Sequence, residues 1–255
     1  MPPDTAGSEI PRRPRPGRLF FAGFAIAIAI TVLIGFSRTY YFKEFSTAPP
    51  LPVLFHVHGA LFTSWVLLLI SQAFLIAGSR TAVHRRLGIL GALLVPPMLV
   101  TGIIVAVLAA RGEGPLSSAV ASGAFEFVLP EIPPLVGMVV PFASVSLFSV
   151  FVGLGLLYRQ RPAAHKRWMA LAAVAMLPPV LGRAAATLVG VAHPTLFFGP
   201  TILFIAAIGI HDWRTAGRVH PVTLWGGLTL LASFPLRLAL GNSDPWLRFA
   251  EWLTA

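Results

Sequence analysis

The chain has 255 residues, of which 56% are hydrophobic and only 11% are charged, and its mean hydropathy is +0.81. A water-soluble domain of this length needs far more polar surface, so the composition excludes a soluble globular protein. There is no cysteine, which excludes disulfides, thiolate metal sites, iron–sulfur clusters and a cysteine nucleophile.

Long apolar runs follow one another along the chain. A bilayer core about 30 Å thick needs roughly 20 apolar residues in a helix, and backbone groups in lipid have to be satisfied within their own segment. The predicted spans are 18–37, 51–78, 84–110, 134–158, 166–190, 197–212 and 221–241. A Pro-rich basic tail over 1–17 precedes them and is expected to be disordered, and an external tail over 242–255 follows them. We therefore expect an all-α polytopic bundle with seven spans, forming one domain over 18–241.

The formal net charge is +10. The positions of the basic residues indicate a role in membrane topology rather than in nucleic-acid binding. The surplus of basic residues lies before the first span and in the turns after the second, fourth and sixth spans. Basic residues in the other connections and in the C-terminal tail are balanced by acidic ones. By the positive-inside rule, this pattern predicts a cytoplasmic N-terminus and an external C-terminus. The basic turns also favour membrane lipid with anionic headgroups as a partner.

Two of the basic turns look like copies of one another. The first reads SRTAVHRRLGILGALLVPP over 79–97, and the second reads QRPAAHKRWMALAAVAMLPP over 160–179. Each has an arginine four residues before a histidine, two basic residues after it and a Pro-Pro pair further along. A third turn, WRTAGRVHPVTLWGGLTLLASFP over 213–235, is a fainter copy. The repetition predicts a lone first span followed by three helical hairpins.

The Pro-Pro pairs predict interruptions within the spans. Proline has no N–H, so we expect Pro96-Pro97 and Pro178-Pro179 to break helical hydrogen bonds near the middle of the membrane.

Seven histidines are the main chemical feature of this apolar chain. The predicted topology sorts them into an inner layer and an outer layer. The inner layer holds His84, His165, His211 and His220, and the outer layer holds His56, His58 and His193. Neutral imidazole is the commonest metal ligand in proteins, so each layer is a candidate ligand set.

Polar side chains share one face of the second predicted span. At helical spacing, one stripe carries His58, Phe62, Trp65, Leu69 and Gln72. An imidazole inside an apolar run is energetically unfavourable unless it has a partner, which favours a functional role for His58. Gly59 beside it leaves room for a bulky flat group. Gln72 also fits a plain interhelical hydrogen bond. Arg183 fits either a partner for an anionic group beside His58 or a side chain that reaches the membrane surface.

These residues carry a resemblance to a known family. The string HGALFTSWVLLLISQAFLIAGSRTAVHRRLG over 58–88, together with HKRWM over 165–169 and Arg183, resembles an uncharacterised family of predicted bacterial polytopic membrane proteins. The likeness covers roughly residues 55–185 and implies a helical bundle in the bacterial inner (cytoplasmic) membrane. The layered histidines are more distantly similar to those of b-type membrane cytochromes, which implies haem b as a cofactor and a redox partner.

Three functions stay open from the residues. In the first, the protein is a haem b redox protein with His58 as an outer axial ligand and His84 and His165 as inner ones. The cations that would neutralise the haem propionates are Arg85, Arg86, Lys166 and Arg167, with Arg183 on the outer side.

In the second, the protein is a metal-dependent enzyme acting on a lipid-like substrate. Zinc or iron would be held by His84, His165 and His211, or by an outer set that includes His58. The outer set would join His56 and His193 with two carboxylates of the loop 111–134, Glu126 and Glu131. In the third, the protein is a non-catalytic membrane subunit or small-molecule binder. Lys166 stands at the first residue of the predicted span 166–190, and no lysine lies deeper in any predicted span, so seven helices do not here imply a retinal Schiff base.

Overall fold

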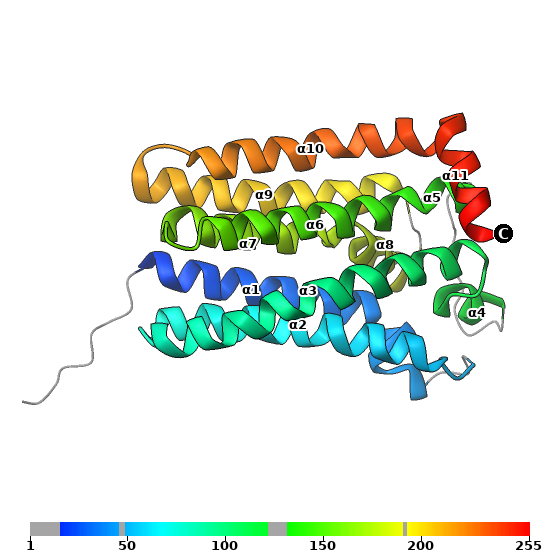
Figure 1. The fold of residues 1–255 in the computed structure, drawn as a ribbon, viewed down its shortest axis with the longest axis horizontal. Helices are drawn as coiled ribbons and strands as arrows, with labels where there is room; N and C mark the ends of the chain where they lie inside the picture. The colour runs from blue at the N-terminus through cyan, green and yellow to red at the C-terminus, as the bar shows by residue number, and fades with distance from the viewer. Residues whose placement is uncertain (1–15, 46–48, 122–131, 191–192) are drawn as a thin grey trace, which may run out of the picture.

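Long helices lie side by side in the computed structural model, which describes residues 16–45, 49–121, 132–190 and 193–255 (Figure 1). Its helices are α1 (Pro16–Phe36), η1 (Ser37–Tyr41), η2 (Lys43–Phe45), α2 (Val53–Ala77), α3 (Thr81–Ala110), α4 (Pro115–Ala121), α5 (Pro134–Gly137), α6 (Val139–Leu157), α7 (Pro162–Ala175), α8 (Leu177–Val189), α9 (Pro194–Ala216), α10 (Pro221–Gly241) and α11 (Asp244–Thr254). No strand occurs in these ranges, so the all-α prediction is confirmed.

Six of the described helices are long and apolar enough to cross a membrane, and a seventh span results if α7 and α8 form one broken span. The predicted spans agree with these helices to within a few residues at most ends. Large apolar side chains point outward from the bundle, including Leu67, Leu93 and Leu236, which are 59%, 65% and 64% exposed. An apolar outer surface over the length of the helices is compatible with an integral membrane protein.

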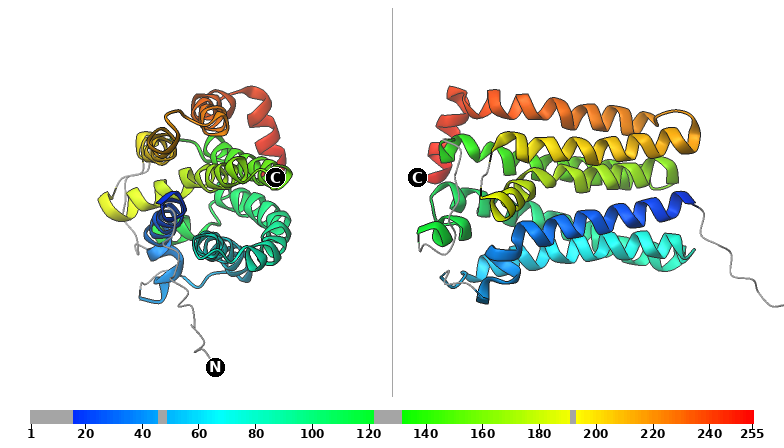
Figure 2. Two further views of the ribbon diagram at one scale, coloured as in Figure 1. Left: turned by 90° about the vertical axis from the view of Figure 1, so that its left-hand side faces the viewer. Right: turned by 180° about the vertical axis from the view of Figure 1, so that it is seen from behind.

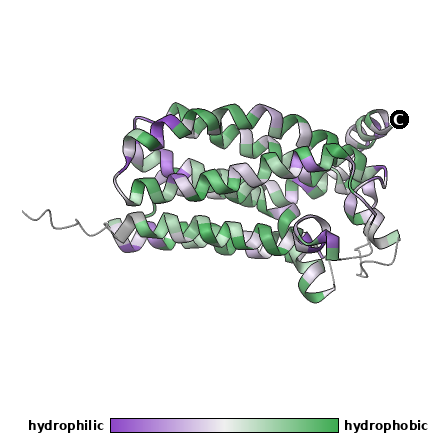
Figure 3. Ribbon diagram, turned by 90° about the horizontal axis from the view of Figure 1, so that it is seen from below, coloured by the Kyte–Doolittle hydropathy of each residue, from purple (hydrophilic) through white to green (hydrophobic). Residues whose placement is uncertain are grey.

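Hydrophilic residues gather towards the two ends of the bundle (Figure 3). We call one of them the basic end, defined by the start of α1 and by the α2–α3, α6–α7 and α9–α10 turns, on the left of Figure 1. The turns that the positive-inside rule places in the cytoplasm therefore lie together. The predicted orientation of the termini stays a prediction, and most of the tail over 1–17 lies outside the described residues.

The helix boundaries follow from local chemistry. Proline stands in the first turn of α7, α9, α10 and α11, where its missing N–H has no helical partner to lose. Helices α8 and α9 end on glycine in the left-handed region, with φ of 70° at Gly190 and 67° at Gly217. That conformation costs glycine little and closes the helix end.

The two Pro-Pro pairs behave differently. Helix α3 runs through Pro96 and Pro97 without ending, so the hydrogen bonds that these prolines cannot make do not break the helix there. The second pair does end a helix: α7 stops at Ala175, and α8 begins at Leu177 with a bend of 46°. Figure 1 shows α8 turning away from the bundle axis.

Helix α7 lies in the middle of the molecule. The views in Figure 2 show α6 and α7 between the α9–α10 pair on one side and α1, α2 and α3 on the other. Every residue from Ala170 to Ala175 is at most 5% exposed. Small residues allow the close approach, because a Cβ on Gly226 of α10 would lie 2.5 Å from Leu171 Cδ1. Close packing of small residues is the usual way in which membrane helices associate.

The segment 242–255 forms a helix rather than an irregular tail. Ser243 caps α11 by accepting the N–H of Trp246. The indole N–H of Trp246 donates to the carbonyl of Leu135 at 2.9 Å, and Arg111 Nε donates to the carbonyl of Thr254 at 2.9 Å. Helix α11 thus packs across the end opposite the basic end. A serine before Asp-Pro was the signal for this helix.

Candidate functional site

Two of the seven histidines cap helices. His220 Nδ1 accepts the N–H of Val222 at 3.1 Å at the start of α10, and His193 Nδ1 accepts the N–H of Thr195 at 3.3 Å at the start of α9. In both places the histidine precedes a proline. A His-Pro step at a helix start therefore was a sequence signal for capping. These two rings have a structural role.

Two further histidines pack against aromatic rings. His211 stacks on Phe20 with ring centres 4.0 Å apart and planes 3° apart, which joins α9 to α1. His56 is exposed, and its ring centre lies 6.0 Å from that of Tyr40, whose hydroxyl donates to the carbonyl of His56. The remaining three histidines are His58, His84 and His165.

His84 and His165 face each other at the basic end, although 81 positions separate them in the chain. Their ring centres lie 6.1 Å apart, and their planes are almost perpendicular at 86°. One ring comes from the first turn of α3 and the other from the first turn of α7. They are equivalent residues in the two repeat copies. The repeat has thus brought together the two inner histidines that the sequence indicated.

The His165 ring is oriented by the backbone. Its Nδ1 lies 2.8 Å from the carbonyl oxygen of Gly155, which can only accept, so Nδ1 carries the proton. A neutral His165 ring then keeps an unprotonated Nε2. A ring nitrogen that donates to a backbone carbonyl is the usual companion of a metal-ligating nitrogen on the other side of the ring.

Gln72 holds the backbone at His84. Its Nε2 donates to the carbonyl of His84 at 3.1 Å, from α2 to α3. Gln72 Oε1 and His84 Nδ1 are both buried and have no hydrogen-bond partner among the described residues. Unpaired buried polar atoms are uncommon, because each costs about 1–3 kcal/mol. The predicted stripe of α2 therefore ends at the histidine pair.

The four predicted propionate cations separate into two groups. Arg85 and Arg86 are exposed beside His84, and they are available to an anionic group there. Lys166 Nζ lies 4.8 Å from the ring centre of Phe21, and Arg167 is 6% exposed. The guanidinium of Arg167 is already paired with Asp212, so a propionate would have to compete with that carboxylate.

Arg167 forms a buried ion pair with Asp212, a residue that is completely buried. Its Nε donates to both carboxylate oxygens at 3.0 Å, its Nη2 donates to Oδ1, and its Nη1 donates to the carbonyl of Ala163 at 2.6 Å. The carboxylate also accepts from Thr223 Oγ1 at 2.6 Å and from the N–H of His220 at 3.2 Å. Asp212 therefore ties α7, α9 and α10 together. It is not a free general base.

His58 lies apart from this pair, as expected. Its ring packs on Phe62 at 4.3 Å, its Nδ1 is buried without a partner, and Arg183 is close enough for the two charges to interact. No second histidine ring contacts it in the part of the chain that the structure describes. The space expected beside Gly59 is filled, because a Cβ there would overlap the ring of Tyr40.

Arg183 and Arg237 both point into the bundle. The Arg183 guanidinium lies 5.2 Å from the ring centre of Phe36 on α1. Arg237 is 2% exposed, and its Nη1 donates to Ser144 Oγ at 3.0 Å, while its Nε and Nη2 have no hydrogen-bond partner within the described ranges. Arg237 does not reach the membrane surface. Its burial was not visible from its position near the end of a span.

The predicted three-histidine metal site does not form. Within the described ranges, no three His, Cys, Asp or Glu side chains are placed to hold a metal ion. His211 belongs to the stack on Phe20 instead of joining His84 and His165, and His58 lies near the start of α2, far along that helix from the basic end. Glu126 and Glu131, which the alternative outer site requires, lie outside the described residues.

Comparison of the chain with protein-family models, with curated proteins and with solved structures finds no match. The site's chemistry therefore rests on its own geometry.

Proposed function

We propose that this integral membrane protein is a redox protein that binds one haem b between His84 and His165. The observation that carries the proposal is the separation of 6.1 Å between the two ring centres. Two imidazoles that bind one ion from opposite sides, with metal–nitrogen bonds of about 2 Å, place their ring centres about 6 Å apart. A bound haem would supply one-electron chemistry at this end of the bundle.

The protein's own groups prepare both ligands. Gly155 accepts from His165 Nδ1, which leaves Nε2 basic and fixes the ring plane. Gln72 fixes the backbone of His84. The unpaired Nδ1 of His84 and Oε1 of Gln72 are buried polar atoms that a bound group or its ordered water would satisfy. The ligands come from two different helices, so no same-helix pair of histidines is needed.

The surrounding charge suits a dianionic cofactor. Arg85 and Arg86 follow His84 directly, are exposed, and are two donors for propionate carboxylates. Lys166 follows His165 on α7 and adds a further positive charge near the site. In this proposal His58 and Arg183 hold no haem, because His58 has no facing histidine in the described structure. A bacterial cytoplasmic membrane and an electron-transfer partner remain part of the proposal.

The absorbance spectrum of the protein tests this function. Protein purified from haem-replete cells is expected to show a Soret band and, after reduction, a sharp α-band. His84→Ala and His165→Ala should each lose most of the bound haem, since each removes an axial ligand. His211→Ala is the matched control, because it removes another histidine at the basic end but leaves the pair intact.

A colourless wild-type protein would overturn the proposal and favour a non-catalytic membrane subunit. Equal haem loss in His211→Ala would also count against it, since the loss would then reflect general unfolding.

A further inference from the structure

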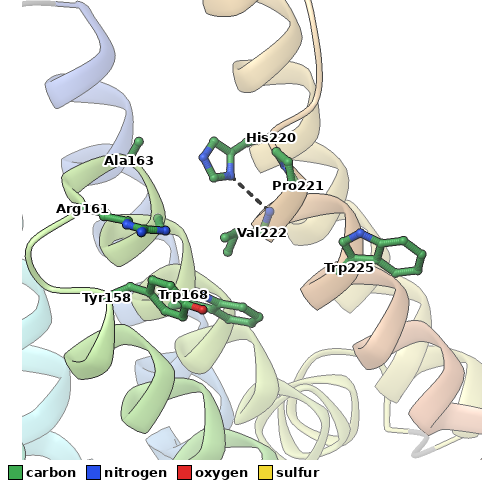
Figure 4. A pocket seen from close by; sticks show the side chains of 9 residues that line it. Tyr158, Arg161, Ala163, Trp168, His220, Pro221, Val222 and Trp225 are labelled. Carbon is green, nitrogen blue, oxygen red and sulfur yellow. Dashed lines mark hydrogen bonds between the residues drawn. The ribbon is translucent and has the colours of Figure 1, made fainter.

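A groove of about 400 Å³ opens at the basic end between the α6–α7 turn and the start of α10. Its walls include Tyr158 and Arg161 from the turn, Trp168 from α7, and His220 and Trp225 from α10 (Figure 4). The groove is separate from the proposed haem site, which lies between α3 and α7. The function proposed above does not use it.

The groove carries hydrogen-bond donors. His220 Nδ1 accepts the N–H of Val222, so the neutral ring holds its proton on Nε2 and donates from there. Trp168 Nε1 is buried and has no hydrogen-bond partner in the part of the chain that the structure describes, and an indole nitrogen can only donate. The Arg161 guanidinium lies 5.7 Å from the ring centre of Tyr158, which holds it at the wall of the groove.

The charge of the groove is positive. None of its lining residues is acidic, and the nearby Asp212 is occupied by Arg167, Thr223 and the N–H of His220. Burial, then the Arg167 charge, lowers the pKa of His220; Asp212 opposes this shift, and the charges of Lys166 and Arg218 add to it. Three donors with a net positive charge suit a phosphate group.

The groove continues onto an apolar, outward-facing surface. Trp225 at its edge is 66% exposed, and Leu224 and Leu228 on α10 are 47% and 45% exposed. Tryptophan beside charged residues at the end of a span is typical of the membrane interface. A ligand with a phosphate in the groove therefore has room for acyl chains along α10.

We propose that this groove is a binding site for the phosphate of an anionic phospholipid in the leaflet at the basic end. Arg161, His220 Nε2 and Trp168 Nε1 donate to the phosphate oxygens, and the acyl chains lie against α10.

Binding of phosphatidylglycerol to the delipidated full-length protein in detergent tests the site. Native mass spectrometry would compare phosphatidylglycerol with phosphatidylcholine, and inorganic phosphate would serve as a competitor. We expect tighter binding of phosphatidylglycerol, and a loss of about tenfold in affinity for Arg161→Gln, the effect of removing one charge-assisted hydrogen bond. Arg159→Gln is the control, because Arg159 lies in the same turn and donates to its own turn at Leu156.

His220→Asn removes the Nε2 donor but keeps a side chain that caps helices well, so it should weaken binding without unfolding the protein. The melting temperature of each variant checks the fold. Equal affinities for the two lipids, or unchanged affinity in Arg161→Gln, would overturn the proposal. Displacement of the lipid by millimolar inorganic phosphate would assign the groove to free phosphate and so overturn the lipid as its occupant.

Discussion

The two repeat copies share a sequence pattern but occupy opposite environments. The first copy, at the start of α3, faces outward: Ile89, Leu90 and Leu93 are 64%, 55% and 65% exposed. In the second copy, Leu171 and Val174 of α7 are completely buried. The same sequence pattern thus forms an outer helix of the bundle in α3 and a central helix in α7. Position in the bundle, rather than the pattern, determines what each side chain does.

The different effects of the two Pro-Pro pairs follow from their neighbours. Proline removes a hydrogen bond in both helices. In α3 the helix stays continuous, and the Thr101 hydroxyl donates to the carbonyl of Pro97 at 2.8 Å. In the second copy the bent segment α8 packs tightly against α1, where a Cβ on Gly35 would lie 2.6 Å from the carbonyl oxygen of Val180. The bend is therefore stabilised by packing of α8, and proline permits it.

The largest effect is expected at the second basic residue after each repeat histidine. Arg167 is paired with buried Asp212, whereas its counterpart Arg86 is exposed. Arg167→Ala should lower the free energy of unfolding by about 3–5 kcal/mol, because it leaves a buried carboxylate unpaired, and Arg86→Ala should change it by less than about 0.5 kcal/mol. Denaturant unfolding in detergent measures both. Equal effects at the two positions would contradict the contrast between the copies.

A smaller effect is expected at the proline pairs. Replacing both Pro178 and Pro179 by alanine should destabilise the protein by about 1–3 kcal/mol, because a straight α7–α8 helix cannot keep the packing of α8 on α1. Replacing both Pro96 and Pro97 should be neutral or stabilising, since alanine suits the interior of a continuous helix far better. The melting temperatures of the two double variants test this. Only the variant at Pro178 and Pro179 should melt at a lower temperature than wild type. A comparable loss at Pro96 and Pro97 would contradict this contrast between the two pairs.

The smallest effect concerns His220, the histidine of the third and faintest copy. Its folded-state pKa lies below the ordinary value of 6.5, from burial and then the Arg167 charge, with Asp212 opposing and Lys166 and Arg218 adding to the effect. The unfolded chain therefore takes up the proton first. Stability should be level above pH 6.5 and should fall as the pH drops further.

Protonation would also remove the cap at Val222. The difference in unfolding free energy between wild type and His220→Asn isolates this contribution from the other histidines. A difference that does not change between pH 7.5 and 5.5 would be inconsistent with the capping role.

Much of the fold could be predicted because membrane burial imposes long apolar runs. The spans and the basic turns follow from that requirement alone. Helix α11 was missed because its cap, Ser243, was passed over in a segment interpreted as a tail. The continuity of α3 and the bend at Met176 depend on which neighbouring helices lie beside them, and hydropathy does not encode that.

The histidine pair was predictable from the sequence, but the charged groups around it were not. The repeat indicated His84 and His165, and the fold places their ring centres 6.1 Å apart with near-perpendicular planes. Arg167 and Asp212, 45 positions apart, carry no joint sequence signal, so their ion pair was not foreseen. The roles of His193 and His220 were missed, although His-Pro steps at both helix starts were visible.

The central claim is that the two repeat copies meet to give one pair of axial ligands. Electron paramagnetic resonance of the oxidised, purified protein tests it most directly, because two imidazole ligands give low-spin ferric iron. We predict a low-spin signal with the strong anisotropy of near-perpendicular imidazole planes, present in wild type and His211→Ala and lost in both His84→Ala and His165→Ala. A high-spin signal in the wild type, or a low-spin signal that survives either substitution, would contradict the account.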